Sequence, residues 1–262
     1  KGESLPVAEI EEIVVANSTM PYEDYQACRD FDLSIEIFNN DSIFLDLVTF
    51  LVRHGVKRSE FILASHDQII NGNGVLPDLY AQFREEEKTN LWENKEELEA
   101  FVQQPGVIDR YIDGEYGTNE LYKYRALAVF YHIEALHDIT YDVAQTLLEA
   151  RGVYDDSVAD YLTQLREFSL MRKHHILDTE RNEQRTFRFD FAKLMDNKFM
   201  IDPFDVHCPE GVDVEVYHSE NQCELISGYL KQYGDTLIGL GRILIRANMN
   251  RLYRTARSSN MD

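Results

Sequence analysis

The chain has 262 residues, of which 44% are hydrophobic, with 15 tyrosines and 14 phenylalanines. This composition is typical of a folded protein with a large core and argues against a disordered one. The formal net charge of −21 argues against nucleic-acid binding, because phosphates would be repelled. No apolar run approaches the roughly 20 residues needed to span a bilayer. Three cysteines provide no disulfide framework, so we expect a cytoplasmic protein.

The first predicted elements are a buried strand and a helix. Residues 13–16, Ile-Val-Val-Ala, form an apolar, β-branched run typical of a strand buried on both faces. Ser18 and Thr19 are candidate caps, and Pro21 suits the first turn of the following helix. Because one strand cannot form a sheet, we expect residues 1–40 to be a βα segment at the end of a larger α/β domain.

The next region, residues 41–172, is predicted to be helical. An apolar stripe from Ile43 to Val52, followed by Gly55, is typical of an amphipathic helix with a glycine just past its end. Capping and first-turn residues predict further helices that begin near Ser59, Pro77, Asn94, Thr118 or Asn119, Thr140 and Asp155. The helix from Thr118 or Asn119 is expected to be the longest and to include Leu136.

The last region, residues 173–262, is predicted to hold a small antiparallel sheet and then helices. Strict alternation over 186–191 and 212–216 predicts strands with one wet face, and 175–177 is a candidate third strand. Residues 219–257 return to helical spacing. The predicted fold class is therefore α+β and mainly α-helical, with regions 1–40, 41–172 and 173–262.

Two parts of the chain resemble cobalamin-binding-type radical SAM proteins. The segments that carry the likeness are 18–20, 23–25, 28–31 and 35–40, which resemble the stretch after the catalytic barrel, and 232–234, 240–244 and 252–254, which resemble the C-terminal end. The resemblance implies S-adenosylmethionine, a [4Fe-4S] cluster and often cobalamin for the complete enzyme. The family's CxxxCxxC loop is absent here, so none of these groups is expected to bind to this chain. The implied partner is an upstream radical SAM barrel of the same polypeptide.

Five positions are candidates for facing a substrate. Asn17, Ser18 and Thr19 follow the predicted strand, where the loops of a barrel form its active site. Arg29 and Glu36 are charged residues within an apolar run, and burying them requires partners. For this pair there are two interpretations: salt bridges that hold the following helices in place, or side chains that line the mouth of a barrel. We favour the salt bridges.

A metal site is a further hypothesis, based on His132, Glu134 and His137. Glu134 and His137 stand three residues apart on a predicted helix, as in di-iron bundles. A second helical Glu-x-x-His is missing, so ordinary polar contacts are the favoured interpretation.

Five arginines are predicted to share the last helix, at positions 242, 246, 251, 254 and 257. We interpret them as charge complementarity with an acidic chain, in preference to an anion site.

Three functions from different classes remain open. The first is an accessory C-terminal region of a radical SAM enzyme, which closes the barrel and shapes substrate access without a catalytic centre of its own. The second is a stand-alone acidic helical module that binds a basic protein partner. The third is a metal-dependent enzyme that uses the helical histidine and glutamate cluster.

Overall fold

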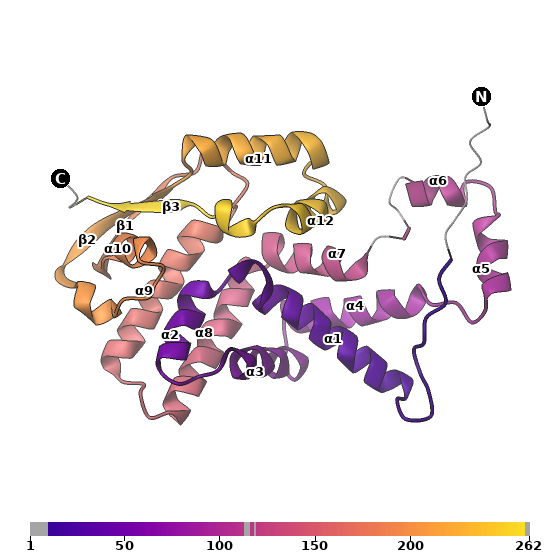
Figure 1. The fold of residues 1–262 in the computed structure, drawn as a ribbon, viewed down its shortest axis with the longest axis horizontal. Coiled ribbons are helices and arrows are strands. Elements are labelled where there is room, and N and C mark those ends of the chain that lie inside the picture. Colours follow the sequence, from indigo (N-terminus) through magenta and orange to yellow (C-terminus); the bar gives the residue numbers. More distant parts are fainter. Residues whose placement is uncertain (1–9, 113–115, 118, 260–262) are drawn as a thin grey trace.

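A computed structural model of the chain describes residues 10–112, 116–117 and 119–259; Thr118, one of the predicted helix starts, lies outside them. The fold is α+β and mainly helical, with a three-stranded antiparallel sheet, as the sequence predicts (Figure 1). The sheet lies at one end of the elongated molecule, and the last two helices extend from it toward the middle (Figure 1). The short helices α5 (Lys95–Val102) and α6 (Val107–Ile112) lie at the other end (Figure 1).

The predicted buried strand over residues 13–16 is wrong. The segment is not paired with any strand of the described residues, and most of its side chains are exposed, with Val14 at 72% and Ile13 at 51%, while Val15 is half-buried. A β-branched run becomes a strand only where a neighbouring strand takes its backbone hydrogen bonds, and no strand of the described ranges lies beside this one. The helix that was expected next is present as α1 (Tyr22–Phe38), and Pro21 occupies its N-cap position.

The helical region follows the predicted caps closely. Its helices are α2 (Leu45–Arg53), α3 (Arg58–Ile70), α4 (Val75–Thr89), α5, α6, α7 (Glu120–Ala126), α8 (Ile133–Ala150) and α9 (Asp156–Lys173). The side chains of Asn94 and Asn119 accept hydrogen bonds from the first turns of α5 and α7. The carboxylate of Asp155 accepts from two backbone amides of α9. Gly55, after α2, has φ 80°, a conformation that glycine adopts without strain.

The predicted long helix through Leu136 is wrong, because it is broken at His132. A π-helical turn over Leu127–Tyr131 separates α7 from α8, and His132 leaves helical geometry with φ −126° and ψ 27°. Thr140 does not begin a helix but lies inside α8, where its hydroxyl donates to the Leu136 carbonyl at 2.8 Å. A threonine can bond either to a cap or to the preceding helical turn, so its presence alone does not mark a start.

The sheet is formed by β1 (Glu183–Phe189), β2 (His207–Tyr217) and β3 (Thr255–Ser258), in the order β1-β2-β3. Phe187 pairs with Val212, and both point to the buried face against α9 and the short helix α10 (Phe191–Asp196). The alternating charged residues of β1 and β2 face solvent, as predicted for strands with one wet face.

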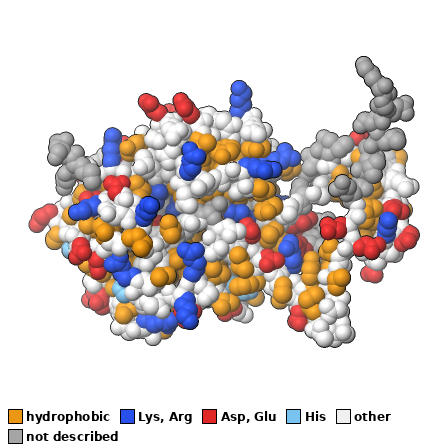
Figure 2. Space-filling model, viewed as in Figure 1, with side chains coloured by type: hydrophobic (Ala, Val, Ile, Leu, Met, Phe, Trp, Pro, Cys, Tyr) orange, Lys and Arg blue, Asp and Glu red, His pale blue; other side chains and the backbone are white. Residues whose placement is uncertain are grey.

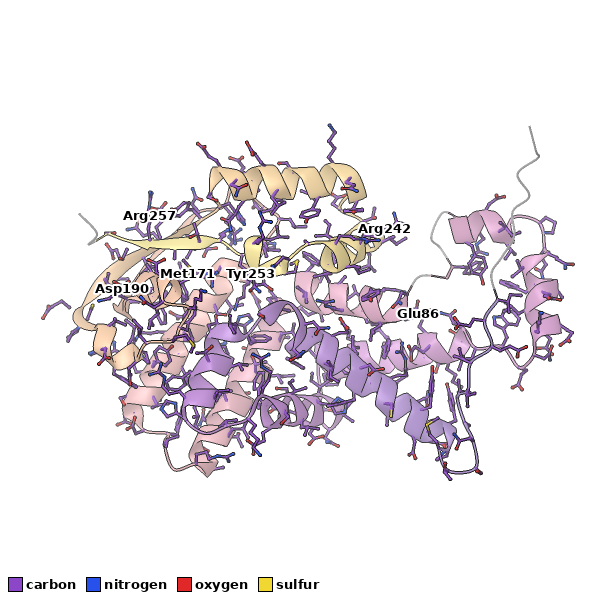
Figure 3. All side chains as sticks on the ribbon, in the orientation of Figure 1. Glu86, Met171, Asp190, Arg242, Tyr253 and Arg257 are labelled. Atoms are coloured by element: carbon purple, nitrogen blue, oxygen red, sulfur yellow. The ribbon has the colours of Figure 1, made fainter. Side chains whose placement is uncertain are left out.

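The third strand differs from the predicted one. Residues 175–177 form a turn, and β3 comes instead from the stretch expected to be the last helix. That stretch divides into α11 (Glu220–Tyr233), α12 (Leu237–Arg246), a 3-10 turn at Met249–Arg251 and β3. Its five arginines therefore do not all share one helix: Arg242 and Arg246 are on α12, whereas Arg257 is on β3 (Figure 3).

Arg254 is fully buried and donates hydrogen bonds to backbone carbonyls around the turn that follows α9. The accepting carbonyls belong to Met171, His174, His175, Asp178 and Arg181. A guanidinium is suited to this role because it presents five donors in a rigid plane. Arg254 thereby joins the segment before β3 to the end of α9.

One continuous cluster of buried side chains runs from α1 to β3, across the boundary at residue 172. On the face drawn in Figure 2, acidic side chains gather over α5, and both signs of charge are interspersed elsewhere. Among the helices of the described residues, none has the length and apolar character to cross a membrane.

Candidate functional site

Asn17, Ser18 and Thr19 form an exposed turn before α1. The Asn17 carboxamide oxygen accepts hydrogen bonds from the backbone amides of Thr19 at 2.9 Å and Met20 at 3.0 Å. It also accepts from the Thr19 hydroxyl at 2.9 Å. The three residues line neither of the two cavities described below.

Arg29 and Glu36 each form an ion pair with another helix. Arg29 donates to Glu87 of α4 at 2.5 Å, and Arg125 of α7 donates to Glu36 at 2.8 Å. The bond to Glu87 raises the pKa of Arg29. A cavity of about 410 Å³ lies between α1 and α4, but neither Arg29 nor Glu36 lines it. In this chain both residues connect α1 to its neighbouring helices.

His132, Glu134 and His137 do not converge on one point. Glu134 is mostly exposed and lies 3.5 Å from His174, whereas His137 is fully buried. Both ring nitrogens of His137 are engaged, Nδ1 with the Ile133 carbonyl at 2.8 Å and Nε2 with the Ser169 hydroxyl at 3.0 Å. Within the described residues no group of three histidines, cysteines or carboxylates is placed to hold a metal ion.

The polar group that the sequence did not single out is a buried ion pair between α2 and α9. Lys173 Nζ lies 3.0 Å from Asp46 Oδ2, and the two side chains are 3% and 2% exposed. They are 127 residues apart in sequence. Asp46 stands at the start of the predicted apolar stripe of α2, and this single charge among apolar residues was the one available signal. Nothing in the sequence indicated its partner.

Lys173 also connects this pair to His137. Lys173 donates to the Ser169 hydroxyl at 2.5 Å, so that hydroxyl is free to donate to His137 Nε2. Burial lowers the pKa of His137 to about 3, with Lys173 adding to the effect, so its ring is neutral. Burial also lowers the pKa of Lys173 to about 8, and Asp46 opposes that change. Burial disfavours the ionised form of Asp46 and by itself would raise its pKa. The cations Lys173 and Arg172 outweigh this effect and hold the pKa below its ordinary value.

This ion pair forms part of the wall of a cavity of about 280 Å³. The wall comes from the start of α2, the end of α9, the turn after α10 and the segment around the 3-10 turn after α12. Its residues are Ser42, Leu45, Asp46, Arg172, Lys173, Met195, Lys198, Phe199, Asn250 and Tyr253. Figure 3 shows Tyr253 close to Met171 near the end of α9. Three of these residues are cationic and one is anionic, in a chain whose net charge is −21.

The backbone of the cavity wall is strained. Four described non-glycine residues have positive φ, and Ser42, Lys198 and Phe199 of the cavity wall are three of them, at 52°, 54° and 58°. Such conformations cost energy for residues with a Cβ and are enriched at binding and catalytic sites. The strain therefore marks this cavity as the strongest candidate for a small-molecule site in the described chain.

Comparison of the chain with protein-family models, with curated proteins and with solved structures gives no match. The cavity and the exposed segment before α1 must therefore be interpreted from their own chemistry.

Proposed function

We propose that this chain is the accessory C-terminal region of a cobalamin-binding-type radical SAM enzyme. In this role it closes one end of the catalytic barrel and shapes access for a substrate, and it acts in the cytoplasm. The chemistry takes place in the barrel, which is the partner of this region within one polypeptide.

The observation that carries the proposal is the exposed segment before α1. Residues 13–16 have the composition of a buried strand, yet Val14 is 72% exposed and the segment is not paired with any strand of the described residues. Burying one such valine contributes about 1.5–3 kcal/mol, so a neighbouring barrel that pairs with this segment and buries it would stabilise it as a strand. The acidic charge of the chain also fits a protein partner better than a nucleic acid.

The cofactors of such an enzyme do not fit the residues present here. The three cysteines, Cys28, Cys208 and Cys223, lie on α1, β2 and α11 and are free. An iron–sulfur cluster needs converging thiolates, and these three form no such group in the described chain. No step of the reaction is therefore assigned to this region.

The first test is the coding sequence upstream of residue 1. We expect a CxxxCxxC triplet a hundred or more residues earlier, ahead of repeating βα units. If an upstream region without that triplet and without βα repeats is found, the proposal is overturned. An acidic module that binds a basic protein then takes its place.

A second test measures docking directly. The 262-residue chain and the upstream barrel are produced separately and titrated against each other by calorimetry. Val14→Asp is expected to weaken association at least tenfold, because it places a charge in the paired strand. Val52→Asp is the matched control, since Val52 is 53% exposed on α2, and it is expected to leave the affinity unchanged. Equal affinities for the two variants would contradict docking through this segment.

A further inference from the structure

We propose that the cavity between α2, α9 and the turn after α10 binds a small molecule that carries a phosphate or carboxylate group. The proposal is independent of the radical SAM assignment, because it rests on the wall of the cavity alone.

The charge of the cavity favours an anion. Asp46 neutralises Lys173 in part at 3.0 Å, and Arg172 acts on the same carboxylate from a longer distance. Among the described residues, no carboxylate lies within ion-pair distance of Lys198 or Arg172. Arg172 uses Nε to donate to the Arg254 carbonyl at 2.8 Å, which fixes the guanidinium plane. Its two terminal nitrogens make no hydrogen bond to described residues and remain for an oxyanion, which arginine binds with two parallel bonds.

A buried hydroxyl on one residue of the wall supplies a second, independent argument. Tyr253 is 4% exposed, and its hydroxyl has no hydrogen-bond partner within the described chain. Leaving a buried hydroxyl unpaired is costly, so such a group points to a ligand or water that completes it. The Tyr253 ring also lies 5.7 Å from Lys173 Nζ, which places it beside the cationic part of the cavity.

The remaining wall sets the size and character of the rest of the ligand. Leu45, Met195, Phe199 and the Tyr253 ring are apolar and suit a short carbon skeleton. A volume of about 280 Å³ is near the lower end for small-molecule sites, which excludes a dinucleotide-sized ligand.

The experiment titrates the chain with sodium phosphate and, separately, with sodium acetate by isothermal calorimetry. Ionic strength is held constant with sodium chloride, because a chain of charge −21 responds to salt in general. We expect a dissociation constant on the order of 1 mM for the preferred anion, since so small a probe has few contacts. Preference for phosphate or for acetate identifies the group that the natural ligand carries.

Two variants locate the binding. Lys198→Gln removes an exposed, unpaired charge and is expected to weaken binding about tenfold, as is Tyr253→Phe. Lys193→Gln is the matched control, because Lys193 is an exposed lysine of α10 outside the cavity wall, and it should bind as the wild type does. Tyr253→Phe should fold normally, since it removes only an unpaired hydroxyl. The proposal is overturned if neither anion binds, or if either cavity variant binds with unchanged affinity.

Discussion

From the buried ion pair between Asp46 and Lys173 we predict how the free energy of unfolding changes when one charge is removed. Lys173→Met removes the ammonium group but leaves the Asp46 carboxylate 2% exposed, without its partner at 3.0 Å. An uncompensated buried charge costs about 3–5 kcal/mol, so the free energy of unfolding should fall by that amount. The double variant Asp46→Leu/Lys173→Met removes both charges and should recover most of the loss, because apolar residues of similar volume often replace a buried pair without cost.

The measurement is urea unfolding followed by far-UV circular dichroism for the wild type and both variants. Lys95→Met is the control, because Lys95 and Glu99 form an exposed pair at 3.7 Å on α5. That change should cost less than about 0.5 kcal/mol. The reasoning is refuted if Lys173→Met costs no more than the control, or if the double variant is no more stable than the single one.

Three other predictions concern buried groups and helical glycines. The pKa of His137, about 3, lies below its ordinary value of 6.5, so its neutral ring contributes stability above pH 6.5 that is lost as the pH falls toward 3. Between pH 6.5 and about 5, the unfolding free energy of the wild type should fall about 1.6 kcal/mol more than that of His137→Leu, by urea titration at each pH. Arg254→Met leaves several carbonyls unpaired and should lower the free energy of unfolding by about 3–5 kcal/mol in the same assay. Arg257→Met, at an exposed arginine, should lower it much less, and similar losses for the two variants would contradict the role of Arg254 as a buried donor. Gly239→Ala would place Cβ 2.3 Å from the Tyr233 carbonyl oxygen and should lower the free energy of unfolding by about 1–3 kcal/mol. Gly228→Ala meets nothing within 4 Å and should raise it by about 0.5–1 kcal/mol. Equal thermal melting temperatures for the two variants would disprove this prediction.

The helices were predictable because their signals are local. Asn94 and Asp155 cap the helices that follow them, and the stripe after Ile43 matches α2. The alternating strands were recognised for the same reason, since β1 and β2 each carry their own pattern of buried and exposed residues. A cap or an alternation needs only neighbours in sequence.

The wrong predictions, of a strand at Ile13 and of a helix at β3, have a non-local cause. The run from Ile13 has the composition of a buried strand, but pairing depends on a second strand that the described chain does not place beside it. The residues of β3 look helical in isolation and become a strand because β2 offers its edge, with Val216 opposite Ala256. Non-local pairing decides both cases.

The candidate site was hidden from the sequence for the same physical reason. Its wall is assembled from separate elements, and Asp46 and Lys173 have no common motif. The residues that a motif did suggest, such as His137, are used inside the core. Unpaired donors and backbone strain identified the cavity, and both appear only in three dimensions.

The contacts of Arg254 have a consequence for how this protein is made. The residues after α9 are synthesised well before Arg254, whose guanidinium their carbonyls bind, since Arg254 follows His174 by 80 residues. Until Arg254 leaves the exit tunnel, the carbonyls at the end of α9 can bond only to water. A chain that stops before Arg254 therefore lacks these hydrogen bonds, and such a product would expose a surface that quality-control chaperones recognise.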